Sequence, residues 1–593
     1  MKTQKTISRI LSTAAVAAMS MSSLFAQTNL GADCGCPSVG SRPIVNLSTL
    51  ADSYGELTAS NTILSCNNMY KLDAKIYVPN GKSLTIQPGT VIKGIKAAVA
   101  GQANALVVER GGKIFASGTE KCQIVFTADA DPMDGTFPVT SVGQWGGVVL
   151  LGKANVNLTV AANTTSGTTT RYCAGADGTG FIEGFSGDVL NGSGVGMNIY
   201  GGGTTPDEDD NSGILKYVSI RYAGDVLPIV AGTAADGSNE LNGLSLGAVG
   251  RGTTIEHIEV ISSADDNIEF FGGTVNVKYV TTMFGADDMF DFDLGYKGKV
   301  QYYFGIKTAT NDTTLTKTAD NGIEADADDD KANPPHALRS HPIFYNCTFV
   351  GNGRQDGHAD NTGPAAIQAK ELTEGEFYNS VFVNFRSGLH LATNRNATFG
   401  DAYDNWTNAT TAYNNGGTGV AVKNSLIVKN NTFVGCTNAV TTGKLNNGNK
   451  WDRTDGTGIA FKQATLGSAA DITQFNTTDG NVTIASLTGM AGTNYTWSMA
   501  STTNNIVSAP FDLTPTANLT STITAPADGF FSPVSYRGAF DASKPSWLSG
   551  WAYATLLKTS AGLQDNPTDI NKDGITNGTD FGLLLAKYGQ ANK

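Results

Sequence analysis

Twelve residues near the C-terminus, from Asp569 to Asp580, carry the residue types that bind a hard cation. Oxygen-bearing residues occupy loop positions 1, 3, 5, 9 and 12, and Gly574 stands at position 6, where such a loop turns sharply. The expected ligands are Asp569, Asn571, Asp573, the carbonyl oxygen of Ile575 and Asp580, with Asn577 acting through water. Position 12 is Asp rather than the longer Glu, which makes two-oxygen binding there less assured. The sequence predicts that this loop binds one Ca²⁺; the alternative is a polar turn that happens to fit the pattern.

A short helix is expected directly after this loop. Its apolar residues follow the i, i+3, i+4, i+7 spacing of one helix face: Phe581, Leu584, Leu585 and Tyr588. The loop and helix resemble one half of a dockerin, the calcium-dependent module that docks cellulosomal enzymes onto scaffold proteins. A complete dockerin has two such loops, and residues 551–567 hold no second one. The resemblance therefore implies Ca²⁺ binding by an attachment, capping or sorting module, but not binding to a cohesin.

A second group of acidic residues recurs in the middle of the chain. When residues 267–271, 289–293 and 322–326 are aligned, two columns form: Glu269, Asp291 and Glu324 in one, and Asp293 and Asp326 in the other. Residues two apart on a strand share a face, so both columns are expected on one outward surface. Four more carboxylates lie in the preceding turns: Asp265, Asp266, Asp287 and Asp288. Stacked carboxylates repel unless cations, protons or donors intervene, and the candidate donors are Arg339, Lys297 and Lys299.

Three interpretations of these columns stay open. They bind a cation such as Ca²⁺ or a sugar, or their side chains cap backbone amides of turns without any ligand, or they are catalytic. Pectate-lyase-like β-helices use carboxylate-bound Ca²⁺ to acidify a uronate proton and a nearby Arg or Lys to remove it. Arg339, beside Glu324 and Asp326 in this reading, is the candidate for that base. The strong local motifs of those lyases are absent from the sequence, so no catalytic residue is assigned.

The elements that position these residues are expected to be nearly all β. Short runs of Val, Ile, Leu, Phe and Tyr are separated by Gly, Asn, Asp and Thr, with almost no helical periodicity, and glycine is abundant at 70 residues. Apolar triplets begin at Leu84, Leu106, Ile124 and Val148. Their intervals of 22, 18 and 24 residues suit one coil of a solenoid.

The repeat is sharper further along the chain. Residues 257–260 match 277–280 at an interval of 20, and the Ala-Asp-Asp run at 264–266 returns at 286–288. Phe270 and Phe292 are expected to stack inside two successive coils. Later strands are expected at 343–350, 376–383 and 422–428, with long turns or loops at 399–420 and 443–505. We predict an all-β fold: a right-handed parallel β-helix followed by the short calcium loop and helix.

Several runs are similar to those of a family of secreted or outer-surface β-helix proteins of Gram-negative bacteria. The runs are residues 84–94, 143–147, 250–258, 266–273, 290–299 and 536–540, and the resemblance extends over about residues 45–553. It implies the same architecture for this chain. The family comes without an established enzymatic activity, so the resemblance informs the fold more than the function.

Export is expected from the first 26 residues. Lys2, Lys5 and Arg9 precede an uncharged stretch that ends before the small residue Ala26, which is the pattern of a secretory signal peptide. The stretch is too short for a membrane anchor, and no later segment is apolar enough to span a bilayer. A lipid anchor on Cys34 is the less favoured alternative because Asp33 precedes it.

Seven cysteines are too few for a disulfide scaffold in a chain of 593 residues, so burial must stabilise the fold. The expected bridge joins Cys34 or Cys36 to Cys66, and the odd number leaves at least one thiol unpaired in a monomer. The formal charge of −13 argues against binding nucleic acid or an anionic membrane by charge and favours divalent cations as partners.

We therefore expect three parts: a signal peptide at 1–26, a β-helix at 27–553 and a dockerin-like calcium tail at 554–593. The favoured function is that of a non-catalytic extracellular or cell-surface protein that binds glycan or another surface molecule. The alternative is a polysaccharide lyase or glycosidase that carries a dockerin-like module.

Overall fold

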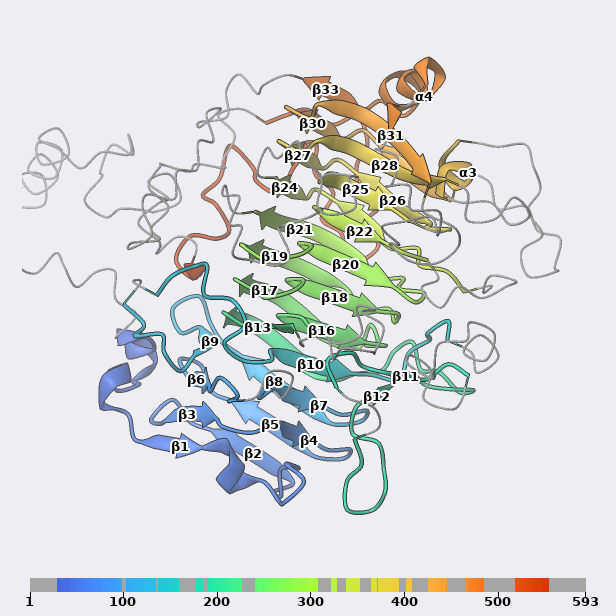
Figure 1. Cartoon of the computed structure of the whole chain (residues 1–593). Helices are drawn as coiled ribbons and strands as arrows, with labels where there is room; N and C mark the ends of the chain where they lie inside the picture. Colours follow the sequence, from blue (N-terminus) through green and yellow to red (C-terminus); the bar gives the residue numbers. More distant parts are fainter. Residues whose placement is uncertain are drawn as a thin grey trace, which may run out of the picture.

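The computed structural model describes residues 29–98, 103–134, 137–158, 177–185, 189–226, 240–307, 321–327, 338–351, 364–370, 372–393, 402–407, 425–444, 465–466, 468–484 and 518–553. Within them the chain winds into coils that stack along one axis (Figure 1). Each coil contributes one strand to a sheet that we call sheet I and one bent strand, or two short ones, to a sheet that we call sheet II.

Sheet I has eleven strands among the described residues, and all but the last pair in parallel. In spatial order they are β4 (Ile76–Val78), β7 (Leu106–Val108), β10 (Val148–Leu151), β16 (Leu244–Gly247), β18 (Ile268–Phe271), β20 (Phe290–Asp293), β22 (Ile323–Ala325), β25 (Ala365–Ala369), β28 (Ser387–Thr393), β31 (Asn438–Lys444) and β32 (Thr465–Leu466).

Sheet II is built from two parallel ladders that merge in the middle of the solenoid. One ladder begins with β1 (Ile44–Asn46), β3 (Met69–Leu72), β6 (Val91–Gly94) and β9 (Ile124–Ala128), and the other with β2 (Asn61–Leu64), β5 (Ser83–Ile86) and β8 (Lys113–Ser117). Long bent strands then span both: β13 (Gly213–Arg221), β17 (Thr254–Ile261), β19 (Val277–Met283) and β21 (Lys299–Ile306). The ladders separate again as β23 (Ile343–Tyr345) and β24 (Thr348–Val350), β26 (Gly375–Tyr378) and β27 (Val381–Val383), β29 (Leu426–Lys429) and β30 (Thr432–Val434), with β33 (Val482–Ile484) last.

The remaining elements are short. Two antiparallel pairs leave the coils, β11 (Gly180–Phe181) with β12 (Ile199–Tyr200) and β14 (Asp225–Val226) with β15 (Glu240–Leu241). The helical elements are η3 (Ala32–Cys34), η4 (Val39–Ser41), η5 (Leu47–Leu50), α3 (Ala402–Trp406), α4 (Ala469–Thr473) and η7 (Gln474–Thr478). The described residues therefore confirm the prediction of an all-β parallel β-helix.

The register of the coils corrects two details of the sequence alignment. Ile255, not His257, pairs with Val277, so this interval is 22 rather than 20 residues. A shift by two residues keeps the same face inward, so an apolar pattern alone does not exclude it. The triplets at Leu84 and Ile124 lie in sheet II, whereas those at Leu106 and Val148 lie in sheet I, so their intervals do not measure one coil.

Aromatic rings fill the interior of the middle and upper coils. Phe270 and Phe292 are register partners, as predicted, and both are fully buried. The ring that stacks on Phe270, however, is Phe290, with centroids 4.6 Å apart. Higher up, Phe349, Phe382 and Phe433 form a column with spacings of 5.5 and 5.0 Å. Each coil thus buries its apolar side chains against the next, which is the main source of stability in a solenoid.

The bend in the strands of sheet II is made by residues with left-handed backbone. Tyr217, His257, Tyr279 and Tyr302 all have φ between 49° and 58° and stack ring on ring, 4.4 to 5.0 Å apart. In the later coils asparagines take the same place: Asn346, Asn379 and Asn430. Asparagine tolerates this conformation because its side chain bonds locally, whereas the aromatic residues depend on stacking to hold it.

The last described segment, residues 518–553, lies against sheet II, and we call it the strap (Figure 1). Trp551 packs edge-on against Tyr217 and His257, so the strap covers the stacked bend. Its end is fixed in the core, where the amide of Tyr553 donates to both carboxylate oxygens of Glu259 at 2.8 and 3.0 Å. The strap thereby fixes the point from which the chain continues toward residue 593.

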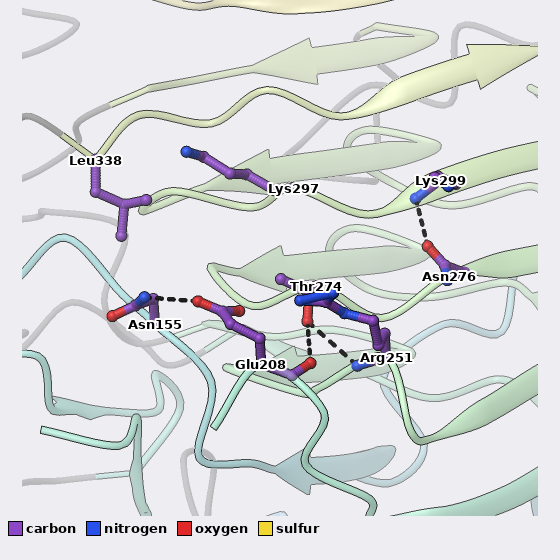
Figure 2. A pocket seen from close by; sticks show the side chains of 8 residues that line it. All are labelled: Asn155, Glu208, Arg251, Thr274, Asn276, Lys297, Lys299 and Leu338. Atoms are coloured by element: carbon purple, nitrogen blue, oxygen red, sulfur yellow. Dashed lines mark hydrogen bonds between the residues drawn. The ribbon is translucent and has the colours of Figure 1, made fainter. Parts of the chain in front are cut away.

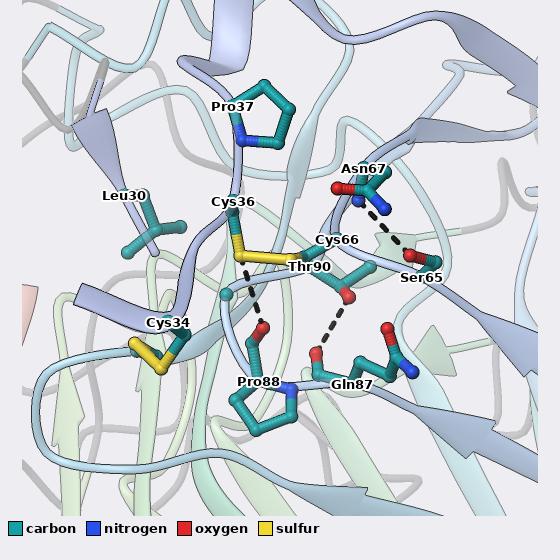
Figure 3. Close-up of a disulfide and its surroundings, with 12 residues drawn as sticks. Leu30, Cys34, Cys36, Pro37, Ser65, Cys66, Asn67, Gln87, Pro88 and Thr90 are labelled. Atoms are coloured by element: carbon teal, nitrogen blue, oxygen red, sulfur yellow. Dashed lines mark hydrogen bonds between the residues drawn. A yellow bond between two sulfur atoms is a disulfide. The ribbon is translucent and has the colours of Figure 1, made fainter. Parts of the chain in front are cut away.

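Two disulfides hold the N-terminal segment against the first coils. The expected Cys36–Cys66 bridge is confirmed, and Figure 3 shows it joining this segment to a turn of the second ladder. Cys34 pairs with Cys122, a partner 88 residues away that was not predicted. Cys347 and Cys436 are free, as the odd count requires of at least one cysteine.

The two predicted loop regions contain regular structure. Helix α3 lies within 399–420, and β32, α4, η7 and β33 lie within 443–505. Because β33 pairs in parallel with β30, the solenoid extends further than predicted. The prediction of plain loops is therefore wrong for the described residues in these regions, whose Asn-, Thr- and Gly-rich composition hid short apolar elements.

Candidate metal centre

The predicted C-terminal calcium ligands Asp569, Asn571, Asp573, Ile575 and Asp580 lie outside the described residues, as does the predicted signal peptide. The acidic residues of the middle coils are described and come together at one place. They lie at the start of β18 and β20 and in the turns that lead into these strands. We call Asp265, Asp266, Glu269, Asp287, Asp288 and Asp291 the carboxylate cluster.

Part of the cluster forms a ladder that caps backbone amides from one coil to the next. Asn242 accepts from the amide of Asp266 at 3.1 Å, and Asp266 accepts from the amide of Asp288 at 2.6 Å. Asp288 accepts in turn from the amide of Asn321, and Asn321 from that of Ala365 at 3.0 Å. The ligand-free interpretation of the turn residues is therefore right for Asp266 and Asp288, which satisfy amides that would otherwise be buried without acceptors.

The two acidic columns exist with the predicted register. Glu269 pairs with Asp291, and Asp291 with Glu324. The column continues into residues that the sequence alignment missed, Gln368 and His390. On the other side it begins as Tyr77, Val107 and Val149, whose apolar side chains are covered by the excursion that carries β11 and β12. The outer face of sheet I thus changes from apolar to acidic at β18.

The columns are not the open surface that was predicted. Glu269, Asp293 and Asp326 are only 6, 7 and 6 % exposed. Glu183, in the turn after β11, is the nearest carboxylate to add its charge to that of Glu269, so the excursion also borders the cluster. The columns face outward from the sheet, but neighbouring segments cover them.

The donors that neutralise the columns also differ from those predicted. Lys370 contacts Glu324 and lies 3.2 Å from Asp326. Lys299 starts a strand of sheet II, where its ammonium lies 2.5 Å from Asp528. Arg339, the candidate base, is 3 % exposed and lies 3.5 Å from Glu374. A buried guanidinium beside a carboxylate is poorly placed to take a proton from a bound polysaccharide.

Burial and mutual repulsion make the cluster hard to ionise. Burial, followed by the charge of Asp265, raises the pKa of Asp266 well above its usual value. Burial and the charge of Glu183 do the same for the pKa of Glu269. Burial and the neighbouring Asp287 raise the pKa of Asp288 to about 6. Clustered carboxyls of this kind hold protons at neutral pH unless a cation replaces them.

The geometry of the cluster fits a divalent cation. Two overlapping sets of three carboxylates share Asp266: one adds Asp265 and Asp287, and the other adds Glu269 and Asp291. Within each set the candidate ligand oxygens lie within 4.8 Å of one another. Two oxygens bound to one Ca²⁺ at about 2.3–2.6 Å lie at most about 5 Å apart, so the spacing suits Ca²⁺. All the donors are oxygens, which hard cations prefer.

Stacked parallel coils with carboxylates gathered on one sheet define a parallel β-helix protein. A family model described as a pectate-lyase-like β-helix domain matches residues 55–460, and the chain belongs to that family. No curated protein and no solved structure matches the chain. No helix among the described residues is long and apolar enough to cross a membrane.

Sequence reasoning missed three residues that complete the cluster: Asn242, Glu183 and Lys370. Asn242 donates to Glu269 and accepts from the amide of Asp266, so it joins the ladder to the column. Its signal in the sequence is weak because it precedes Asp266 by 24 residues, not by the 22 that relate Asp266 to Asp288. Glu183 comes from an excursion and Lys370 from beyond an insertion, so no repeat interval indicates them.

Proposed function

We propose that this chain is an exported, extracellular or cell-surface β-helix protein that binds a polysaccharide or another surface molecule without catalysing a reaction, and that it holds Ca²⁺ at the carboxylate cluster. The observation that carries the proposal is the pair of carboxylate sets that share Asp266. Amide capping accounts for Asp266 and Asp288 but not for the placement of Asp265, Glu269, Asp287 and Asp291 around them. A cation there would offset a repulsion that the amide ladder leaves in place.

The two ends of the chain belong to the same proposal. Residues 1–26 direct export and are removed, residues 27–553 form the β-helix domain, and residues 554–593 bind a second Ca²⁺ and attach the protein to its surroundings. Two disulfides near the N-terminus support an oxidising compartment. The strap supports the attachment role because its buried end fixes the point where the tail begins.

The second candidate is a polysaccharide lyase or glycosidase, and membership of the pectate-lyase-like family favours it. Asp288, whose pKa burial raises to about 6, is the one cluster residue placed to change protonation near neutral pH. Against it stands the burial of Arg339 beside Glu374.

One assay separates these candidates. Purified protein is mixed with polygalacturonate, or with neutral dextran as control, in Ca²⁺ or in EDTA; co-sedimentation reports binding and ultraviolet absorbance reports unsaturated products. The proposal expects retention on the acidic polymer that Ca²⁺ strengthens, with no rise in absorbance. A rise in absorbance would establish the lyase, and equal retention with Ca²⁺ and EDTA would remove the cation from the function.

A further inference from the structure

A second polar site lies at the opposite end of the sheet I strands, where the chain turns into sheet II. It is a pocket of about 360 Å³ on the turns that follow β16, β18 and β20 (Figure 2). Its wall carries three cations, Arg251, Lys297 and Lys299, and one carboxylate, Glu208. Because the chain as a whole has a net charge of −13, three cations around one hollow are an exception on this molecule.

The pocket is held open by hydrogen bonds among its own lining residues. Asn155 donates to Oε1 of Glu208 at 2.6 Å, and the hydroxyl of Thr274 donates to the Glu208 carbonyl at 2.6 Å. The amide of Arg251 donates to the same carbonyl at 2.9 Å. Asn276 accepts from the amide of Lys299 at 2.9 Å. A ligand would therefore enter a site that needs little rearrangement.

Two groups in the pocket have bonding capacity left. Oε2 of Glu208 is buried and has no hydrogen-bond partner among the described residues. Lys297 is exposed, forms no ion pair within the described part of the chain, and extends across the pocket toward Leu338 (Figure 2). The other two cations are already paired, Arg251 with Asp209 at 3.2 Å and Lys299 with Asp528 at 2.5 Å.

The chemistry of these two groups selects the ligand. Glu208 accepts hydrogen bonds and repels anions, so inorganic phosphate or sulfate suits only half of the site. An ammonium group would meet Glu208 but would be repelled by the three cations. A hydroxyl group donates to Glu208 without charge, and an acid group on the same molecule pairs with Lys297. A volume of 360 Å³ lies at the small end of ligand sites, which are about 300–1,000 Å³.

We propose that this pocket binds one acidic sugar unit, with a sugar hydroxyl on Glu208 and the sugar carboxylate on Lys297. The inference rests on the proposed function, because it supplies a contact for the polysaccharide. It differs in that no metal ion takes part: the cations are side chains, and the carboxylate cluster lies at the other end of the strands.

The test is isothermal titration of the full chain with glucuronate, in EDTA, beside glucose and inorganic sulfate. Wild type is expected to bind glucuronate and to bind neither control comparably. Lys297→Ala and Glu208→Gln are each expected to weaken glucuronate binding by about tenfold or more. Lys544→Ala, at an exposed lysine of the strap, is the matched control and is expected to leave binding unchanged.

Each other result overturns the inference. Lack of glucuronate binding by wild type removes the site, and equal binding of sulfate removes the role of Glu208. Unchanged binding by Lys297→Ala places the sugar elsewhere, and this variant keeps its fold because the side chain is exposed, which thermal unfolding checks. If glucuronate binds in EDTA while Ca²⁺ has no effect on polymer retention, the calcium proposal fails and the pocket stands; the reverse result spares only the calcium site.

Discussion

The carboxylate of Asp266 accepts a hydrogen bond from the backbone amide of Asp288, 2.6 Å away in the next coil. The same side chain belongs to both carboxylate sets that could hold a cation. Asp266 therefore has a structural role, which needs only an acceptor oxygen, and a proposed ligand role, which needs the negative charge. The two roles separate because an asparagine keeps the acceptor and loses the charge.

Asp266→Asn and Asp266→Ala should differ in sign. In EDTA, the asparagine variant should be as stable as wild type or more so, because it caps the Asp288 amide and relieves repulsion. The alanine variant leaves a buried amide without its acceptor and should lose about 1–3 kcal/mol of unfolding free energy. Thermal and urea unfolding measure both. Equal destabilisation by the two substitutions would show that the charge itself stabilises the apo protein.

Stability without added cation should increase as the pH falls from about 8.5 to about 6.5. Burial raises the pKa of Glu109 to about 8 and that of Asp288 to about 6, and it also raises the pKa of Glu269. These carboxyls hold protons more tightly in the folded than in the unfolded chain, so their contribution is lost as the pH rises through the folded pKa. Urea unfolding in EDTA across this range measures the slope.

Two comparisons identify the source of that slope. Glu109→Gln should remove its upper part, since Glu109 lies outside the cluster. Saturating Ca²⁺ should reduce the remainder by keeping the cluster ionised. His257 and His390, whose pKa values burial lowers to about 4, act in the opposite direction only below about 6.5. Stability that falls between pH 8.5 and 6.5 would contradict the assignment.

The strap should depend on one buried ion pair. Arg221 lies 3.5 Å from Glu259, both side chains are at most 1 % exposed, and Glu259 also binds the amide of Tyr553. Glu259→Gln removes the carboxylate that faces a buried guanidinium and should cost about 3–5 kcal/mol. Limited proteolysis should then cut residues 518–553 sooner. Glu256→Gln, on the same strand but in a partly exposed pair with Lys216, should cost less than about 1 kcal/mol.

The tail should bind Ca²⁺ independently of the β-helix. Asp569→Ala with Asp573→Ala removes two carboxylates from the twelve-residue loop and should abolish one site in calcium titration. The β-dominated circular dichroism spectrum should stay the same, because the coils do not depend on these residues. Retention of the site in this double variant would show that the ligands are assigned wrongly.

Sequence reasoning reached the fold and the acidic columns because β18 and β20 belong to coils of equal length. A constant interval of 22 residues relates Asp266 to Asp288 and Phe270 to Phe292, so the alignment is visible without a structure. Exposure was not predictable, since the cover over Glu269 comes from the β11–β12 excursion, whose path no repeat encodes. Lys370 was missed for a similar reason.

The basic pocket was likewise beyond the sequence pattern. Lys297 was expected beside the acidic columns because it follows β20 closely in the chain. The turn after β20 carries it to the far end of the strand, where it meets Glu208 from a segment about 90 residues earlier. Sequence proximity fails here because a strand separates its two ends in space, whereas stacking brings distant turns together.

The most direct test of the calcium proposal uses the full chain in which Asp569→Ala and Asp573→Ala silence the tail. Titration of this protein with Ca²⁺ should show a remaining site, and adding Asp266→Asn with Glu269→Gln should abolish it while the unfolding temperature in EDTA is maintained or raised. A tail-silenced protein that takes up no Ca²⁺ at millimolar concentration, or a site that survives the second pair of substitutions, would contradict the assignment of the cluster as a metal centre.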